Sequence, residues 1–105
     1  VCNIMTERGE TDGYSVSDHI RAIDRVCGAE IFDGVLVQRY PPSEVSLKRY
    51  AQKQCHPVFL DREEVAQLKR QLVVANVMQE DHEKGYVRHD PHRLARVLLR
   101  WYTKR

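Results

Sequence analysis

The sequence predicts an α/β protein with a mainly parallel sheet, and two observations carry this prediction. Short runs of branched apolar residues alternate with segments whose apolar residues recur at helical spacing, in the order β-α-β-α-β-α-β-α. Each helical segment follows a run of strand type and can therefore cross over between two parallel strands. The 105 residues, of which 42% are hydrophobic, suit one domain and are too few for two, so we expect a single unit over residues 1–105.

The first strand and the first helix are expected within residues 1–28. VCNIM, residues 1–5, is a short apolar run of strand type. In the helix that follows, one face carries these apolar residues: Val16, Ile20, Ala22, Ile23 and Val26. Ser15 is expected to cap its N-terminus, with Asp18 as the acid of a capping box, and Gly28 to end it in a left-handed conformation.

The second strand is expected in IFDGVLV, residues 31–37, which is rich in branched apolar residues. We favour residues 34–38 as the strand, because the Asp-Gly pair at its start also fits a turn or a bulge. The prolines of YPPS, residues 40–43, should end the strand, since proline cannot donate to a ladder, and Ser43 should cap the next helix. The apolar face of that helix is expected to consist of Leu47, Tyr50 and Ala51.

The third strand is expected at residues 58–60, in HPVFLD. Asp61 should then cap a short helix, with Glu64 in the capping-box position. Two residues of this helix should face inward: Val65 and Leu68.

The last strand is expected at residues 72–77, followed by a polar loop over residues 78–89. Asp90 and Pro91 are the N-cap and first position of the final helix, where proline's missing N–H costs nothing. Its buried stripe is expected to consist of Leu94, Val97, Leu98 and Trp101. RWYTKR, residues 100–105, fits a solvated helix end with a favourable helix dipole.

Charge and cysteine content narrow the function classes. The 17 basic and 15 acidic residues give a formal charge of +2, so the long-range field is weak and we expect no nucleic-acid partner. No uninterrupted apolar run approaches the roughly 20 residues that span a bilayer, so we expect no membrane insertion. Cys2, Cys27 and Cys55 are odd in number and widely spaced, which favours a reducing, cytoplasmic location.

Three connections run from an expected strand into an expected helix: residues 6–14, 39–42 and 78–89. In a parallel sheet such connections emerge at the carboxyl edge, where open α/β sheets bind their ligands. We therefore expect these three loops to share one face of the molecule and to form a ligand site.

The first of these loops carries hydroxyl and carboxylate groups on Glu7, Glu10, Thr11 and Asp12, next to glycines that let a backbone approach a ligand. It leads into a helix N-terminus whose free N–H groups would attract phosphate, which suits a phosphorylated, hydroxyl-rich ligand. The alternative is an acidic solvated loop with glycine in a tight turn. Neither a P-loop nor a G-x-G-x-x-G motif is present.

Arg88 places a permanent cation beside the final helix and could hold a diphosphate in a bidentate contact. Its neighbour His89 fits a general base or an ordinary loop histidine, and Asp90 is interpreted as a cap. Tyr50 fits a core position, although its ring could also stack on a base or a sugar. A metal site at His89 and His92 would need further ligands.

The stretch CNIMTERGETDGYSVSDHIRAI resembles the signature N-x-M-T-x-x-G-E-T-D-x-Y-x-x-S-D-H of the gluconeogenesis factor family, a branch of the CofD-like proteins. Elements similar to RYA, P-V, D and V-R-H-D-x-x-x-L-A follow in matching order. The resemblance covers nearly the whole chain but corresponds only to the C-terminal portion of the family, whose members are several-fold longer. It therefore implies a fragment whose partners include the remaining N-terminal part of the parent protein.

The resemblance implies a Rossmann-like, three-layer fold and a cytoplasmic protein that binds UDP-sugars such as UDP-N-acetylglucosamine. It further implies a link to carbon metabolism and to cell shape. Carried onto this sequence, the ligand residues are Tyr50 and Arg88, with the loop that contains Glu10, Thr11, Asp12 and Tyr14 lining the same cleft. RYPPSEV departs from the more polar segment usual in the family.

These expectations leave two functions open. The first is a UDP-sugar-binding regulator without turnover and without a catalytic residue. The second is a transferase that moves a phospholactyl-type group from a nucleotide-activated donor, with Asp12 or Asp18 holding Mg²⁺ beside the diphosphate. A third possibility is a truncated product that folds poorly, whose exposed sheet edge at residues 1–5 would favour self-association into a homo-oligomer.

Overall fold

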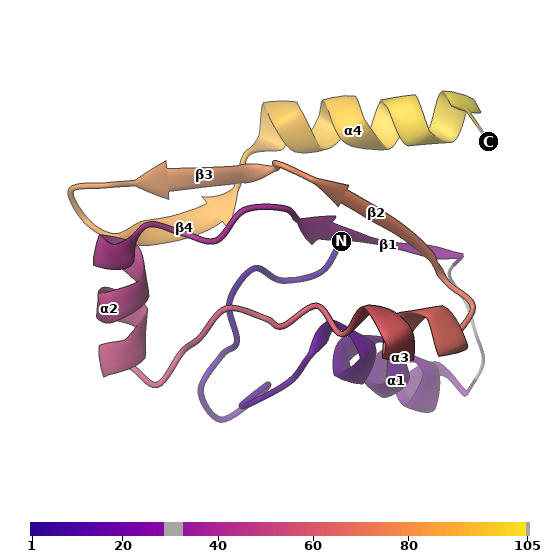
Figure 1. Ribbon diagram of the computed structural model, residues 1–105, viewed down its shortest axis with the longest axis horizontal. Helices are drawn as coiled ribbons and strands as arrows, with labels where there is room; N and C mark the ends of the chain where they lie inside the picture. Colours follow the sequence, from indigo (N-terminus) through magenta and orange to yellow (C-terminus); the bar gives the residue numbers. More distant parts are fainter. Residues whose placement is uncertain (29–32, 105) are drawn as a thin grey trace.

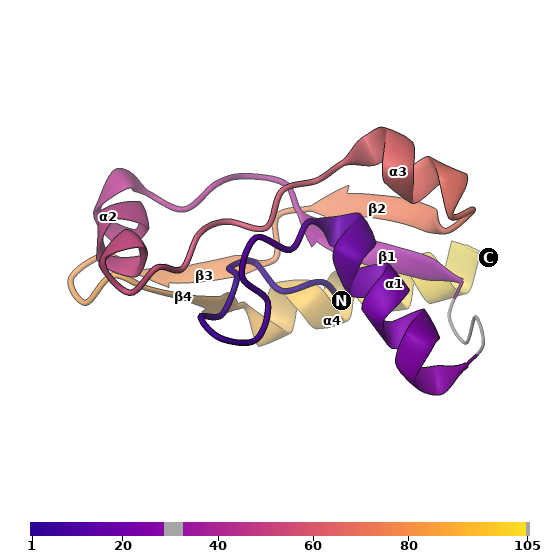
Figure 2. The ribbon, with the colours of Figure 1, turned by 90° about the horizontal axis from the view of Figure 1, so that it is seen from below.

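The computed structural model describes residues 1–28 and 33–104 and shows a mixed α/β unit. Its strands form a middle layer, with α4 on one side and α1 and α3 on the other (Figure 1). Seen from below, α1 lies in front of the strands and α4 lies behind them (Figure 2). The elements in chain order are α1 (Val16–Cys27), β1 (Gly34–Gln38), α2 (Glu44–Gln52), α3 (Arg62–Gln67), β2 (Gln71–Ala75), β3 (Met78–Asp81), β4 (Tyr86–His89) and α4 (Pro91–Lys104).

The strands form two separate pairs. β1 and β2 are parallel, with Gly34 opposite Gln71 at one end and Gln38 opposite Ala75 at the other. β3 and β4 are antiparallel neighbours in a hairpin. The α/β class and one parallel pair are confirmed, whereas the full Rossmann-like order of four parallel strands is not observed.

The prediction of strands at residues 1–5 and 58–60 is wrong, because neither segment forms a strand. The two segments meet at one isolated antiparallel bridge, between Met5 and Pro57, the residue before the second segment. Cys2 N–H donates to a carbonyl of β1 over 2.9 Å, and no ladder continues from that bond. The hydrogen bonds of the bridge run from the Val58 N–H to the Ile4 carbonyl at 2.9 Å and from the Thr6 N–H to the His56 carbonyl at 2.7 Å. Pro57 therefore lies in a non-hydrogen-bonded pair, where its missing N–H costs nothing.

The loop predicted at residues 78–89 is also wrong, because the segment forms β3 and β4. The turn is built by Asp81, whose side chain accepts hydrogen bonds from the Glu83 and Lys84 N–H groups, and by Gly85, which has φ of 71°. Alternate residues of both strands are half-buried. Because polar residues lie on both faces of the hairpin, the segment contains no apolar run that would predict a strand.

The predicted helix ends are confirmed for α1 and α2. Ser15 and Asp18 form the capping box of α1, and Gly28 ends it with φ of 70°. Ser43 caps α2 through the Ser46 N–H. The prediction is wrong at α3, whose N-cap residue makes no side-chain cap bond.

The core lies between β1, α1 and α3. Its buried members are Cys2, Val16, Ile20, Val35, Val37 and Val65, and its half-buried members are Val58, Leu60, Leu68 and Leu72. Val65 and Leu68 thus face inward as predicted. Ile31 and Phe32, expected in the second strand, lie outside the described residues.

Three predicted apolar faces are only partly covered. In α1 Val16 and Ile20 are buried, but Ile23 and Val26 are 44% and 88% exposed, so the predicted face is wrong at these two residues. No residue of α4 is buried: Leu94, Val97 and Trp101 are half-buried, and Leu98 is 38% exposed. A single helix on a two-stranded sheet has too little surface beneath it to bury a whole stripe. In α2 Leu47 and Tyr50 are half-buried, Ala51 is exposed, and the fully buried side chain is Ser46.

Candidate functional site

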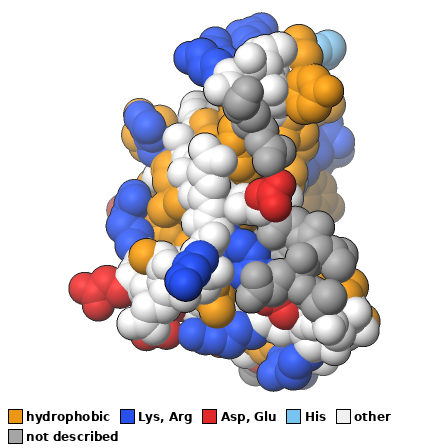
Figure 3. Space-filling model, turned by 90° about the vertical axis from the view of Figure 1, so that its right-hand side faces the viewer, with side chains coloured by type: hydrophobic (Ala, Val, Ile, Leu, Met, Phe, Trp, Pro, Cys, Tyr) orange, Lys and Arg blue, Asp and Glu red, His pale blue; other side chains and the backbone are white. Residues whose placement is uncertain are grey.

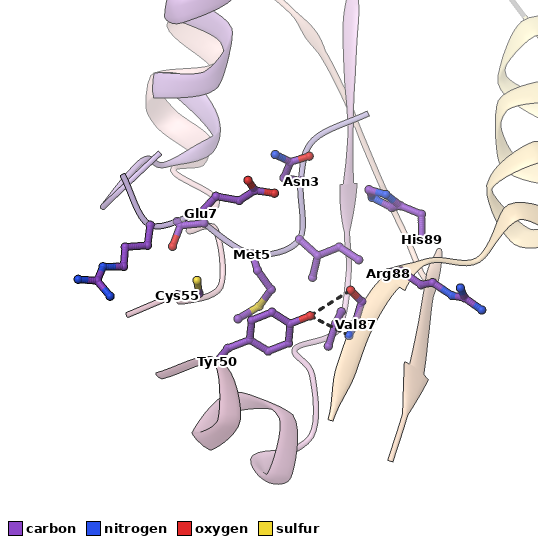
Figure 4. Close-up of a pocket in the computed structure, with 11 residues that line it drawn as sticks. Asn3, Met5, Glu7, Tyr50, Cys55, Val87, Arg88 and His89 are labelled. Atoms are coloured by element: carbon purple, nitrogen blue, oxygen red, sulfur yellow. Dashed lines mark hydrogen bonds between the residues drawn. The ribbon is translucent and has the colours of Figure 1, made fainter. Parts of the chain in front are cut away.

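A cavity of about 400 Å³ opens between the N-terminal segment, α2 and β4 (Figure 4). Its walls include Asn3, Met5, Glu7, Tyr50, Cys55 and His89. The start of the loop at residues 6–14 therefore lies across this cavity from the hairpin of β3 and β4, which the structure forms where a loop was predicted at residues 78–89. We refer to this space as the inner cavity.

Tyr50 lies at the free edge of β4, where its hydroxyl takes the place of a neighbouring strand. The hydroxyl accepts a hydrogen bond from the Val87 N–H at 3.0 Å and donates to the Val87 carbonyl at 3.3 Å (Figure 4). The polar tip of Tyr50 is thus satisfied within the fold. Its ring remains in the wall of the inner cavity, where it can contact a planar or apolar part of a ligand.

Arg88 lies beside Tyr50 but projects from the opposite face of β4. Val87 and His89 are half-buried, whereas Arg88 between them is exposed, as strand alternation requires. Its guanidinium is directed away from the Tyr50 ring (Figure 4), and its Nε donates to Gln79 Oε1 on β3 at 3.3 Å. This places the predicted cation on the other side of the strand from most of the inner cavity.

A second cavity of about 600 Å³, the outer cavity, lies along the hairpin. Its lining includes Tyr50, Gln79, Lys84, Tyr86 and Arg88. Lys84 and Tyr86 were missed at the level of sequence, although the two-residue spacing of Tyr86 and Arg88 would have put them on one strand face. Arg88 and Lys84 give this cavity two cations, and Glu80 and Asp81 give it two carboxylates. Tyr50 borders both cavities.

His89 and Asp90 have structural partners. His89 Nε2 lies 3.2 Å from the Cys2 carbonyl and must donate to it, so this nitrogen is not available as a base. Asp90 Oδ1 accepts hydrogen bonds from the Arg93 N–H at 3.2 Å and the His92 N–H at 2.9 Å, and these bonds hold the pKa of Asp90 below its ordinary value. The interpretation of Asp90 as the cap of α4 is confirmed.

The first loop uses its polar side chains to hold its own shape. Thr11 Oγ1 accepts from the Glu7 N–H at 2.7 Å, and Asp12 Oδ2 accepts from the Gly9 N–H at 2.9 Å. A hydrogen bond with the carboxyl of Glu10, together with its charge, raises the pKa of Glu7. The four predicted ligand residues of this loop do not line the inner or the outer cavity: Glu10, Thr11, Asp12 and Tyr14.

The N-terminus of α1 was expected to offer free N–H groups to a phosphate, and this prediction is wrong. The Val16 N–H donates to the Phe59 carbonyl at 2.9 Å, and the Ser17 N–H donates to Asp61 Oδ1 at 3.0 Å. The Asp61 carboxylate also accepts bonds from the Ser17 and Ser15 hydroxyls. Burial would raise the pKa of Asp61, but the bonds from Ser17 and Ser15 outweigh it and lower the pKa.

The N-terminus of α2 is occupied in the same way by Glu80 of β3. Its carboxylate accepts hydrogen bonds from the Ser43 N–H at 2.9 Å, the Ser43 hydroxyl and the Ser46 hydroxyl. These bonds lower the pKa of Glu80 against the opposing effect of its burial. Since both helix starts already hold a carboxylate, an anionic ligand here would depend on arginine and lysine side chains.

The loop at residues 39–42 lines a neighbouring cavity of about 340 Å³ instead. That cavity shares Asn3 and Ile4 with the inner cavity. The expected convergence of three loops therefore holds for two of them, with the third next to the site.

Within residues 1–28 and 33–104, no group of three or more His, Cys, Asp or Glu side chains is placed to hold a metal ion. The two aspartates considered for Mg²⁺ are engaged with the backbone, Asp12 with the Gly9 N–H and Asp18 with the Ser15 N–H. None of the helices in this part of the chain is long and apolar enough to cross a membrane.

Comparison with known proteins gives consistent matches. The model of the family "2-phospho-L-lactate transferase CofD" matches residues 1–78. A protein of Nostoc sp. strain PCC 7120 named "Putative gluconeogenesis factor" is 61% identical over 103 residues, which are 97% of this chain and 22% of that protein. A protein of the same name from Thermotoga maritima is 38% identical over 102 residues, covering 95% of this chain and 32% of its own length.

The fold is also found in solved structures. Two crystal structures of a Bacillus halodurans protein of the UPF0052 family superpose with TM-scores of 0.87 and 0.86 at 34% identity, over 93% of this chain and 31% of theirs. The chain thus spans about a fifth to a third of the length of these relatives. The family model and the relatives agree with the motif in residues 3–19, and the chain belongs to the CofD-like family, among the relatives named gluconeogenesis factors.

Proposed function

We propose that the chain supplies part of a binding site for a UDP-sugar, of the UDP-N-acetylglucosamine type, in a regulator of carbon metabolism and cell shape. The observation that carries the proposal is the position of Tyr50, between an inner and an outer cavity and beside Arg88. Both cavities have volumes within the range of small-molecule sites, roughly 300–1,000 Å³.

In this proposal the diphosphate is held by Arg88, and Tyr50 contacts the uridine or the sugar. Turning the Arg88 side chain towards a ligand would break its hydrogen bond to Gln79. This bond is exposed to solvent, so its loss would cost little free energy. Lys84 in the outer cavity supplies a second cation. Glu7 in the inner cavity offers acceptors to sugar hydroxyls.

The occupied helix starts support this arrangement. A diphosphate placed at the N-terminus of α1 or α2 would meet the carboxylate of Asp61 or Glu80. Glu80 and Asp81 also line the outer cavity, but their carboxylates already accept hydrogen bonds, Glu80 at the start of α2 and Asp81 in the turn of the hairpin. No ion pair to Arg88 or Lys84 occurs in the described part of the chain, so both cations could turn towards a diphosphate. The remaining roles of the first loop, with Glu10, Thr11, Asp12 and Tyr14, would be to position Glu7.

The same proposal covers the setting of the protein. We infer a cytoplasmic location, a first half of the cleft formed by the N-terminal part of a longer parent chain, and association into a homo-oligomer. Mg²⁺ would enter only with the diphosphate, through its phosphate oxygens, as is usual for nucleotide sites.

The second candidate is a transferase, favoured by the match of the 2-phospho-L-lactate transferase family to residues 1–78. It would move a phospholactyl-type group from a nucleotide-activated donor. The site offers little for proton transfer, because His89 Nε2 donates to a carbonyl and Asp90 caps α4. Mg²⁺-dependent release of nucleotide from an activated phospho-acid would support this candidate over a regulator.

Calorimetric titration of UDP-N-acetylglucosamine tests the proposal. It should be made on the 105-residue chain and on the Nostoc relative carrying this chain in place of its matching segment. Arg88→Ala should lower the affinity by about tenfold or more, since a charge-assisted hydrogen bond contributes roughly 1.5–3 kcal/mol. Arg25→Ala, which removes an exposed arginine from α1, is the matched control and should leave the affinity unchanged.

Circular dichroism of each variant serves as the folding control. Equal affinity of the folded Arg88→Ala variant and the unsubstituted protein would refute the role of Arg88. No binding by either form of the unsubstituted protein would refute the site as a whole.

A further inference from the structure

α4 forms one outer layer of the molecule by itself (Figure 1). None of its residues is buried, and three large side chains point into solvent: Leu98, Leu99 and Tyr102, which are 38%, 64% and 76% exposed. Half-buried Trp101 anchors the opposite side of the helix on β1, where it lies against Gly34. The helix is therefore fixed to the sheet by one side and leaves apolar surface uncovered on the other.

The same helix carries four basic residues and no acidic residue between positions 91 and 104. Arg93 has an ion-pair partner, because its Nε lies 3.7 Å from the carboxylate of Asp90. Within residues 1–28 and 33–104, no ion pair to Arg96, Arg100 or Lys104 occurs. The small net charge of the chain thus conceals a concentration of positive charge on one helix.

The basic and the apolar side chains occupy adjacent strips. At 100° per residue, Arg93, Arg96, Arg100 and Lys104 fall within one sector, and Leu98, Leu99 and Tyr102 within another. At the top of Figure 3, where α4 is seen end-on, Lys and Arg side chains gather on one side and hydrophobic side chains on the other. The two strips flank the side of α4 that is opposite half-buried Leu94, Val97 and Trp101. On that side Leu99 and Arg96 lie about 60° apart, so a flat surface laid there would meet the edge of each strip.

We propose that α4 docks the protein onto an anionic lipid surface. Amphipathic helices with a basic strip beside exposed Leu and aromatic residues bind at the headgroup boundary, where buried apolar area and attraction to anionic lipids act together. Leu99 and Tyr102 would enter that boundary, and Arg96 and Arg100 would contact lipid phosphates. The helix remains parallel to the surface and does not cross it.

Two other occupants fit this face less well. A second copy of the chain, packed α4 against α4, would bring two unpaired basic strips together, which is repulsive. A helix of another protein packs best into a groove, whereas α4 lies on the outside of the molecule (Figure 1). A planar anionic surface complements both the shape and the charge.

Flotation with lipid vesicles tests this proposal. The chain, and the Nostoc relative that carries it, should bind vesicles of phosphatidylglycerol mixed with phosphatidylcholine and should not bind phosphatidylcholine alone. Arg96→Gln with Arg100→Gln should reduce binding by roughly tenfold or more at low salt, since each basic residue near an anionic surface contributes to partitioning. Leu99→Gln should also reduce it, which separates insertion from a purely electrostatic contact.

Two α1 variants are the matched controls. Arg25→Gln removes an exposed arginine, and Val26→Gln removes an apolar side chain that is 88% exposed. Both should bind as the unsubstituted chain does. Trp101 is the only tryptophan, so an unchanged emission maximum on binding will show that α4 stays on the sheet.

Three results would overturn the proposal. They are no binding to the anionic vesicles by folded protein, equal binding to both vesicle types, and full binding by the Arg96 and Arg100 double variant. Binding of an acidic protein partner through α4 with no affinity for vesicles would likewise replace the lipid surface by a protein.

Discussion

Asp61 joins the start of α3 to the start of α1, and its replacement by alanine should loosen this connection. The carboxylate accepts hydrogen bonds from the Ser17 N–H, the Ser17 hydroxyl and the Ser15 hydroxyl. Arg21 adds to the same junction, because one of its nitrogens donates to the Ser17 hydroxyl at 3.1 Å and the other lies 2.9 Å from Glu64 of α3. Asp61→Ala removes the acceptor at the centre of these contacts.

The magnitude follows from the burial of the donors. Ser17 is 1% exposed, and leaving a buried donor without an acceptor costs about 1–3 kcal/mol. Loss of a negative charge at a helix N-terminus adds about 0.3–1 kcal/mol. Water reaches half-buried Asp61, which offsets part of the loss, so we expect a decrease of about 2–3 kcal/mol in the free energy of unfolding and of about 10 °C in Tm.

Urea unfolding followed by circular dichroism measures this difference across a pH series. The lowered pKa of Asp61 means that its contribution is present above its unfolded pKa, near about 4, and is lost as the pH falls through the folded value below that. The difference between Asp61→Ala and the unsubstituted chain should therefore shrink in acid. Glu63→Ala, an exposed acidic residue of the same helical turn, is the control. A difference below about 0.5 kcal/mol at neutral pH, or one that does not change with pH, would refute the reasoning.

Three further predictions concern other contacts. Gly34→Ala should cost about 1–3 kcal/mol and shift the emission of Trp101, because the added Cβ would lie 2.4 Å from the Trp101 ring; unchanged emission would contradict this. Tyr50→Phe should cost about 1 kcal/mol and speed hydrogen exchange at the Val87 amide, and equal exchange would show that the hydroxyl is not its partner. Glu80→Gln should lower the free energy of unfolding by about 1–2 kcal/mol at neutral pH and have no effect in strong acid, since the pKa of Glu80 is lowered; an equal effect at both pH values would count against it.

Local signals predicted the helices well and the strands unevenly. The capping box of Ser15 and Asp18, and the left-handed Gly28, depend on neighbouring residues only, and both were confirmed. β1 was found from its branched apolar run. The hairpin of β3 and β4 was missed because its residues are mostly polar, and pairing with a partner strand rather than composition decides such a segment.

The site was less predictable than the fold, because it depends on contacts across the chain. Tyr50 and Arg88, which the family resemblance named together, both border the inner cavity. The sequence could not show that the Arg88 guanidinium turns away to Gln79. The sequence also suggested free N–H groups at the start of α1. In the structure the Ser17 N–H donates to the carboxylate of Asp61, which lies 44 positions further along the chain. Because β4 was predicted as a loop, the alternation of its side chains between the two cavities was not predicted either.

The carboxylates at the two helix starts have a consequence for the order of folding. The Ser17 N–H and Asp61 are separated by 44 positions, and the Ser43 N–H and Glu80 by 37. Each helix therefore gains its N-terminal partner only after a long loop has closed, late in the approach to the native state. We expect Asp61→Ala to accelerate unfolding while leaving the refolding rate nearly unchanged, so that these two residues govern how long the folded chain persists.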